Sequence, residues 1–167
     1  MTIVYKKIMV TLDGSDFAAQ ALPLAQMLAK SLNAGLVLFR VVPAMDVLSA
    51  PLEIAHAMDE RQQQMVNEVT QTMQALAQNL RRHDLRAEAV IEVGNAAEEI
   101  IDYAREHNVD LIVMSTHGRS GLARWVYGSV AHKVLQHAPC SVFLARSSPE
   151  GSTALNRGNR TETRFLA

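Results

Sequence analysis

The stretch that decides the fold of this chain is Leu111-Ile-Val-Met-Ser-Thr-His-Gly-Arg-Ser-Gly-Leu-Ala-Arg-Trp-Val-Tyr-Gly-Ser129. It begins as a short apolar run typical of a buried strand, and it continues into a loop that carries Gly118 and Gly121. Gly128 and Ser129 then come directly before a helical pattern. Open α/β sheets hold phosphate where a strand leads through a glycine-bearing loop into a helix, because glycine lets the backbone approach an anion and the first N–H groups of the helix point at it. The stretch therefore predicts a nucleotide site.

Short apolar segments alternate with amphipathic segments along the rest of the chain. The expected strands are residues 8–12, 36–42, 85–93, 109–115 and 141–145. The first expected helix, which either Ser15 or Asp16 can cap, runs to residue 32. The others run from the end of a connection at 44–52 to about 82, over 96–106 and over 129–136. This alternation predicts an α/β fold with an open five-stranded parallel sheet, right-handed crossovers and helices on both faces. The carboxyl ends of the first and fourth strands should then share one edge, which brings Asp13 next to the loop after Met114.

Three helical features of the sequence can be checked residue by residue. The helix after the first strand and the long helix both carry apolar residues at spacings of three and four, which predicts that each buries one stripe. These stripes are Ala18, Leu22, Ala25, Leu28 and Leu32 in the first helix, and Ile54, Met58, Met65, Val69, Met73, Leu76 and Leu80 in the long helix. Asn95, followed three residues later by Glu98, is the pattern of a capping box at the start of the third helix.

Composition limits the classes of function. The chain has 167 residues, nearly half of them apolar, which is enough for one domain with a substantial core over residues 1–146. Residues 147–167 are rich in Ser, Thr, Asn and Arg and should form a flexible tail. A formal net charge of −1 gives no reason to expect nucleic acid or an anionic membrane as a partner. The sequence has no apolar run of membrane-spanning length, no signal-peptide layout and a single cysteine, Cys140, so we expect a cytoplasmic domain without internal disulfides.

Three segments together resemble the universal stress protein family, over roughly residues 3–146. The first is Ile8-Met-Val-Thr-Leu-Asp-Gly-Ser15, in which the strand ends at the family's characteristic Asp13. The second is the loop quoted above, from Ser-Thr-His-Gly-Arg-Ser-Gly through Tyr-Gly-Ser-Val-Ala. The third, His137-Ala-Pro-Cys-Ser-Val-Phe-Leu-Ala-Arg146, is similar to the family's last strand. The resemblance implies a Rossmann-like fold of the adenine-nucleotide alpha-hydrolase type.

The ATP-binding branch of that family is marked by Gly, two residues, Gly, nine residues, Gly, and then Ser or Thr. In this chain the second and third glycines of the pattern fall on Gly118 and Gly128, and the hydroxyl falls on Ser129. The first position holds Ser115 instead of glycine. If that position needs a positive φ or lies flat against the ribose, the Ser115 side chain would interfere, whereas serine is a mild change if its φ is ordinary.

The resemblance also implies roles for individual residues. Asp13 should hydrogen-bond the ribose or the adenine, and Thr11 and Val41 should line the adenine pocket. The nucleotide-binding residues implied in this way are Thr11, Leu12, Asp13, Val41, Met114, Ser115, His117, Gly118, Arg119, Gly121, Gly128, Ser129 and Val130. Independently of the resemblance, Ser129 is expected to cap a helix whose dipole favours an anion, and Arg119 and Arg124 could offset phosphate charge.

Several of these residues also have a plainer interpretation. The triplet at residues 13–15 is a common turn after a strand, and only its partnership with the later loop favours a ligand. His117 lies in that loop, but no carboxylate near it in the sequence would orient it for catalysis. His132 and His137 are five residues apart, which is off the spacing of a helical zinc site. Cys140 is expected to be a small packed thiol rather than a reactive one.

Three functions remain open at this point. The first is a nucleotide-binding stress or regulatory protein that takes ATP, ADP or AMP, with the presence of Mg²⁺ left open, and hydrolyses ATP slowly or not at all, because the sequence holds no Gly-x4-Gly-Lys-Ser/Thr loop. The second is an ATP-dependent enzyme, for which Asp13, Asp16 and Lys133 are distant candidates. The third is a non-nucleotide interaction module whose pocket is kept empty by Ser115.

Self-association is expected in all three cases. The segment 141–145 resembles the edge strand through which members of the family pair into dimers. An apolar edge strand that is left unpaired is an aggregation risk. We therefore expect a homodimer with Val142, Phe143 and Leu144 at its interface.

Overall fold

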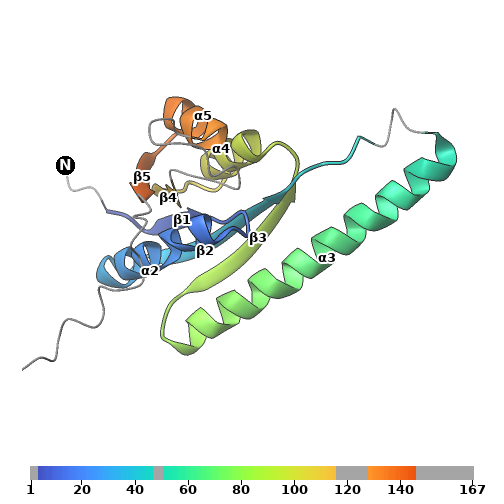
Figure 1. The fold of residues 1–167 in the computed structure, drawn as a ribbon. Helices are drawn as coiled ribbons and strands as arrows, with labels where there is room; N and C mark the ends of the chain where they lie inside the picture. The colour runs from blue at the N-terminus through green and yellow to red at the C-terminus, as the bar shows by residue number, and fades with distance from the viewer. Residues whose placement is uncertain (1–3, 47–50, 116–127, 146–167) are drawn as a thin grey trace, which may run out of the picture.

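The structure is a computed structural model that describes residues 4–46, 51–115 and 128–145. Its strands are β1 (Lys7–Thr11), β2 (Gly35–Val42), β3 (Ala87–Val93), β4 (Leu111–Ser115) and β5 (Ser141–Ala145). Its helices are α1 (Asp16–Ala19), α2 (Ala21–Ser31), α3 (Leu52–Arg82), α4 (Ala96–Glu106) and α5 (Ser129–His137). The alternation of strands and helices is the one that the sequence predicts (Figure 1).

The strands form one parallel sheet in the order β3-β2-β1-β4-β5. The central strand β1 pairs with β2 on one side and with β4 on the other, so that Val10 lies between Leu38 and Val113. The chain order reverses between β1 and β4, and their carboxyl ends meet at one edge. The predicted five-stranded parallel sheet and its reversal point are confirmed.

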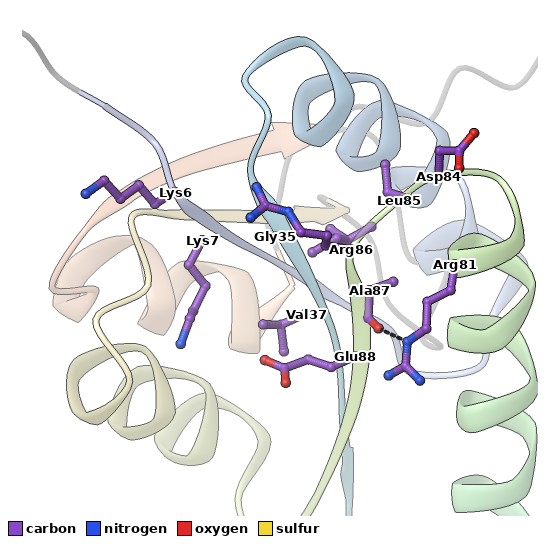
Figure 2. A pocket seen from close by; sticks show the side chains of 11 residues that line it. Lys6, Lys7, Gly35, Val37, Arg81, Asp84, Leu85, Arg86, Ala87 and Glu88 are labelled. Carbon is purple, nitrogen blue, oxygen red and sulfur yellow. Dashed lines mark hydrogen bonds between the residues drawn. The ribbon is translucent and has the colours of Figure 1, made fainter.

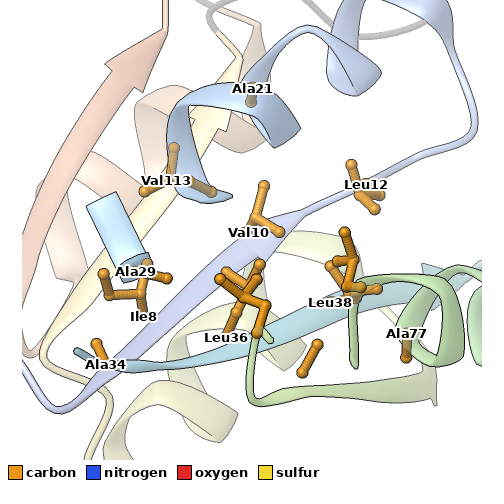
Figure 3. Packing of buried hydrophobic residues seen from close by; sticks show 14 of the residues in the cluster. Ile8, Val10, Leu12, Ala21, Ala29, Ala34, Leu36, Leu38, Ala77 and Val113 are labelled. Carbon is orange, nitrogen blue, oxygen red and sulfur yellow. The ribbon is translucent and has the colours of Figure 1, made fainter. Parts of the chain in front are cut away.

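Helices cover both faces of the sheet and bury two separate clusters of apolar side chains. Figure 3 shows the cluster beneath α2 and α3, where Ile8, Val10 and Leu38 pack against alanines such as Ala21. The cluster beneath α4 and α5 includes Met9, Phe39 and Ile112 on the strands, together with residues of both helices. Because neighbouring strand residues point to opposite faces, these nearly continuous apolar strands supply both cores.

The first helical segment differs from the prediction. Instead of one helix there are two, α1 and α2, separated at Gln20. Ser15 is the cap that the sequence offered, since its Oγ accepts a hydrogen bond from the Ala18 N–H at 3.1 Å. In α2 the buried stripe consists of Ala21, Ala25 and Ala29, and the predicted contact of Leu32 with the core is wrong because this residue lies past the helix end and is 42% exposed.

Helix α3 is longer than the strand it covers. At about 1.5 Å per residue its 31 residues extend about 46 Å, whereas the seven residues of β3 extend about 23 Å. Met73 and Leu80 in its C-terminal half are buried as predicted, but Ile54 is 53% exposed. Figure 1 shows the N-terminal end of α3 reaching beyond the sheet, which is why the first residue of the predicted stripe has no core to enter.

The start of α4 confirms one half of the predicted capping box. The Asn95 side chain accepts hydrogen bonds from the Ala97 and Glu98 N–H groups. The Glu98 carboxylate accepts a hydrogen bond from Lys133 of α5 at 2.8 Å and so joins the two helices of this face. Within the described ranges, none of the helices is both long enough and apolar enough to cross a membrane.

Candidate functional site

A cavity of about 600 Å³ opens at the carboxyl ends of β1, β2 and β4. Pockets that hold small ligands commonly have volumes of about 300–1,000 Å³. The cavity is lined by Thr11, Leu12, Asp13, Ala18, Phe39, Arg40, Val41, Val42, Pro43, Met65, Glu68, Val69, Ala96, Ile100, Met114, Ser115, Gly128, Ser129, Val130 and Ala131. It therefore lies where the strand order reverses, which is where open α/β sheets bind ligands.

Every predicted site residue that the structure describes lines this cavity. They are Thr11, Leu12, Asp13, Val41, Met114, Ser115, Gly128, Ser129 and Val130. The other predicted residues, His117, Gly118, Arg119 and Gly121, lie outside the described residues, as does Arg124. Three segments far apart in the sequence, at the ends of β1 and β4 and the start of α5, thus meet around one space.

The turn after β1 is built by Asp13. Its Oδ1 accepts hydrogen bonds from the Ser15 N–H at 2.9 Å and from the Ser15 hydroxyl at 2.6 Å. Gly14 between them has a φ of +80°, which a residue with a side chain rarely adopts. Residues 13–15 therefore form the turn of the plainer interpretation, and this turn uses one carboxylate oxygen of Asp13. Asp13 also lies at the cavity wall.

Ser115, the departure from the glycine pattern, is the last residue of β4 and is buried. Among the described non-glycine residues, a positive φ occurs at Asn33, Asp84 and Asn108, and so not at Ser115. The backbone of β4 therefore accepts serine at this position without strain. The sequence left open whether this position has a positive or an ordinary φ, and the φ of Ser115 is ordinary.

The start of α5 differs from the prediction in one respect. Ser129 is the first helical residue, and the capping position is occupied by Gly128, which has no side chain with which to cap the helix. The Gly128 carbonyl accepts the first backbone hydrogen bond of α5, from His132. The N–H groups of the first turn have no partner inside the helix. Since Ser129, Val130 and Ala131 line the cavity, the positive end of the α5 dipole lies at its wall.

The comparison with known proteins can be set beside this geometry. The sequence pattern of the universal stress protein family matches residues 4–146. The chain belongs to this family. The match spans all five strands and both sides of the cavity.

Individual members show how close the relationship is. The universal stress protein YxiE of Bacillus subtilis is 32% identical over 148 residues, which cover 86% of this chain and 100% of that protein. The solved structure of the universal stress protein UspA from Lactobacillus plantarum is similar with a TM-score of 0.77 at 26% identity, covering 87% of this chain and 100% of that one. A universal stress protein from Archaeoglobus fulgidus, solved in complex with dAMP, has a TM-score of 0.55 at 19% identity and shares the fold, covering 84% of this chain and 98% of that one.

The structure adds residues to the cavity that the sequence did not indicate. Arg40 comes from β2, and Met65, Glu68 and Val69 come from α3. A Cβ on Gly14 would clash with the terminal nitrogens of Arg40, so the guanidinium packs directly against this glycine. The sequence carried a weak signal for Arg40, since a charged residue interrupts an otherwise apolar strand, but nothing in it placed the middle of α3 at the strand ends.

Other candidate groups do not gather at the cavity. Asp16 and Lys133, which the enzyme hypothesis needed, do not line it. Within the described part of the chain, no group of three or more His, Cys, Asp or Glu side chains could hold a metal ion, and His132 and His137 are part of none. Cys140 packs partly against the α4/α5 cluster, and burial raises the pKa of its thiol, as expected for an unreactive cysteine.

A second hollow, of about 630 Å³, lies at the opposite, amino end of the sheet (Figure 2). Its cations include Lys7, Arg81 and Arg86, but each donates a hydrogen bond to a backbone carbonyl. Figure 2 shows one of these bonds, from Arg81 to the Ala87 carbonyl. None of the sequence-predicted nucleotide-binding residues lines this hollow, so the candidate functional site is the cavity at the carboxyl end.

Proposed function

We propose that this universal stress protein binds an adenine nucleotide in the carboxyl-end cavity and acts as a nucleotide-responsive regulatory protein with little or no hydrolysis. The observation that carries the proposal is the convergence of β1, β4 and α5 on one cavity of ligand size. The neighbour from Archaeoglobus fulgidus, which has the same fold, was solved in complex with dAMP. Its complex supports an adenine nucleotide as the class of ligand.

The phosphates are assigned to the start of α5. The first N–H groups of a helix need partners, and a side chain that caps them removes the site for an anion. At α4 the Asn95 side chain takes this role, whereas at α5 the capping position is Gly128. The N–H groups of Ser129 and Val130 are therefore available to phosphate oxygens at the cavity wall.

The adenosine is assigned to the strand ends. Thr11, Val41 and Met114 offer an apolar and partly polar wall that suits a purine ring. Asp13 keeps its second carboxylate oxygen, Oδ2, for a ribose hydroxyl, because the turn uses Oδ1. Ser115 fits this arrangement because it keeps the extended backbone of β4 up to the last residue of the strand.

Among the nucleotides, ATP is the one that the spacing of Gly118, Gly128 and Ser129 favours by resemblance, with ADP and AMP as the alternatives and Mg²⁺ as a companion of the triphosphate. We expect hydrolysis to be slow. The described wall of the cavity offers the carboxylates of Asp13 and Glu68 and no lysine, and Asp13 is already engaged by Ser15. Fast phosphoryl transfer needs positioned groups beside the γ-phosphate.

We further propose that the protein forms a homodimer through β5 and acts in the cytoplasm. β5 is an edge strand whose residues Ser141–Ala145 carry no charge, and charges are a common protection of exposed edges. Phe143 is 43% exposed, whereas Val142 and Leu144 pack partly against the α4/α5 cluster, so Phe143 offers the largest side chain for the contact. The lone cysteine fits a reducing compartment. Light scattering at micromolar concentration should give twice the chain mass, and a monomer would contradict this part.

The first test of binding is to denature freshly purified protein and identify the released small molecules by chromatography and mass spectrometry. We expect stoichiometric adenine nucleotide, or, for protein purified empty, a rise of the unfolding midpoint with millimolar Mg-ATP. An empty protein whose midpoint does not respond would overturn the proposal. The chain would then be the interaction module that the sequence left as the alternative, with a dimer contact and an empty cavity.

A further inference from the structure

The cavity continues from the proposed nucleotide site onto the other face of the sheet. Side chains alternate along β2, and Phe39 and Val41 pack with the α4/α5 cluster. Arg40 between them therefore projects toward the face covered by α2 and α3. On that side the cavity wall is completed by Met65, Glu68 and Val69 of α3. The cavity thus has two halves, one beneath α5 and one beside α3.

Arg40 is the cation of the second half. Its guanidinium rests against Gly14 in the turn that carries Asp13, and the residue is half-buried. Two carboxylates also line the cavity: Glu68 of α3 is exposed, and Asp13 has its Oδ1 engaged by Ser15. Among the described residues that line the cavity, Arg40 contributes the single positively charged side chain.

We propose that the α3 side of the cavity is a second subsite, which holds a phosphate-type anionic group with Arg40 as its anchor. A planar guanidinium forms paired hydrogen bonds with phosphate oxygens, and the partial burial beside Met65 and Val69 strengthens them by excluding water. The α5 N-terminus supplies donors on the other face, so Arg40 serves a different group from the phosphate that α5 receives.

Two sources could provide this group. One is a distal phosphate of the bound nucleotide, in which case the subsite rests on the proposed function and selects polyphosphate chains. The other is a separate small anion such as pyrophosphate, bound beside the nucleotide. The ligand series below distinguishes these two sources.

The experiment is a set of calorimetric titrations of the full chain with adenosine, AMP, ADP, ATP and inorganic pyrophosphate, the last with and without saturating AMP. The variants are Arg40→Met, which keeps the length of the apolar stem, and Arg40→Lys, which keeps the charge. Arg82→Met is the matched control, since it removes the same charge from an exposed position that does not line the cavity. Unfolding midpoints of all variants confirm that each one is folded.

We expect Arg40→Met to leave the affinity for adenosine within about twofold and to weaken ATP or pyrophosphate by about tenfold or more. Arg40→Lys should retain part of the affinity, and Arg82→Met should match the original chain. A loss for ATP with no pyrophosphate binding identifies the nucleotide chain as the source, and a loss for pyrophosphate identifies a separate anion.

Two results would overturn the subsite. One is an Arg40→Met variant that binds every ligand as the original chain does. The other is a variant that loses adenosine as strongly as ATP, which would make Arg40 a support for the Asp13 turn. If the original chain binds no adenine compound, the proposed function fails, and the pyrophosphate titration still decides the subsite: binding that Arg40→Met abolishes supports it, and its absence overturns it.

Discussion

The two ends of the sheet carry hollows of nearly equal volume but opposite chemistry. Helices α2, α3 and α4 end at the amino end of the sheet. Each is followed by a residue with positive φ, namely Asn33, Asp84 and Asn108. Helix C-termini carry partial negative charge. Lys7 and Arg86 donate hydrogen bonds to backbone carbonyls just beyond α4 and α2, so these cations are already engaged by the protein's own backbone.

The carboxyl end is poor in described cations, yet it is the end to which we assign the anion. There α5 begins after Gly128, and no side chain of the described residues caps its N–H groups, while Asp13 shapes the turn after β1. We therefore propose that the direction of the helices, more than the number of lysines and arginines, decides which end of this sheet receives phosphate.

The sharpest way to break this comparison is Gly128→Glu. The new carboxylate would occupy the positive end of α5 and repel phosphate there, so we expect nucleotide affinity to fall at least about 100-fold, measured by calorimetry. Gln136→Glu adds the same charge to an exposed position near the end of α5 and should change affinity by less than about twofold. Unchanged binding by Gly128→Glu would remove the α5 N-terminus from the site.

A smaller effect is expected from Asp13→Ala. This change removes two hydrogen bonds to Ser15 and the carboxylate oxygen proposed for the ribose. We expect about tenfold weaker nucleotide binding and a loss of about 1 kcal/mol in the free energy of unfolding, the latter measured by urea titration. Asp16→Ala lies in the same segment outside the cavity and is the control, so equal losses of affinity in the two variants would contradict a specific role for Asp13.

The amino end should respond in stability alone. Arg81 donates a hydrogen bond to the Ala87 carbonyl. The Arg86 carbonyl accepts from Leu36 of β2, and successive carbonyls of a strand point to opposite sides. The Ala87 carbonyl therefore points away from β2, on the outer edge of β3. We expect Arg81→Met to lower the free energy of unfolding by about 1 kcal/mol while nucleotide affinity stays within about twofold. Urea titration and calorimetry on the same sample measure both, and a clear loss of affinity would contradict the division of roles between the two ends.

The smallest expected effect concerns Cys140. Burial raises the pKa of its thiol in the folded state above the ordinary value of 9.0. The thiol therefore does not affect the free energy of unfolding at pH values below 9.0. As the pH rises above 9.0, the unfolded chain ionises first and the free energy of unfolding decreases. At pH 8 the native thiol should therefore react with iodoacetamide more slowly than the thiol of urea-unfolded protein. Equal rates would show that Cys140 behaves as an exposed thiol.

Local patterns predicted most of the elements because each depends on residues close together in sequence. The capping residues Ser15 and Asn95 and the apolar strands acted as expected, since a cap or a buried strand is specified by its own few residues. The prediction that Ser129 caps α5 was wrong by one position. Helix boundaries depend on the backbone of the preceding residues, which periodicity does not specify.

The sequence by itself determined the α/β order, the parallel sheet and the meeting of Asp13, Met114 and the start of α5 at one edge, because the handedness of crossovers leaves few other arrangements. Only the tertiary structure decided that Ser115 has an ordinary backbone, that Arg40 lies against Gly14 and that the middle of α3 closes the second half of the cavity. These contacts join segments distant in the sequence. Their geometry depends on how far a long helix extends past a short strand, which no local pattern records.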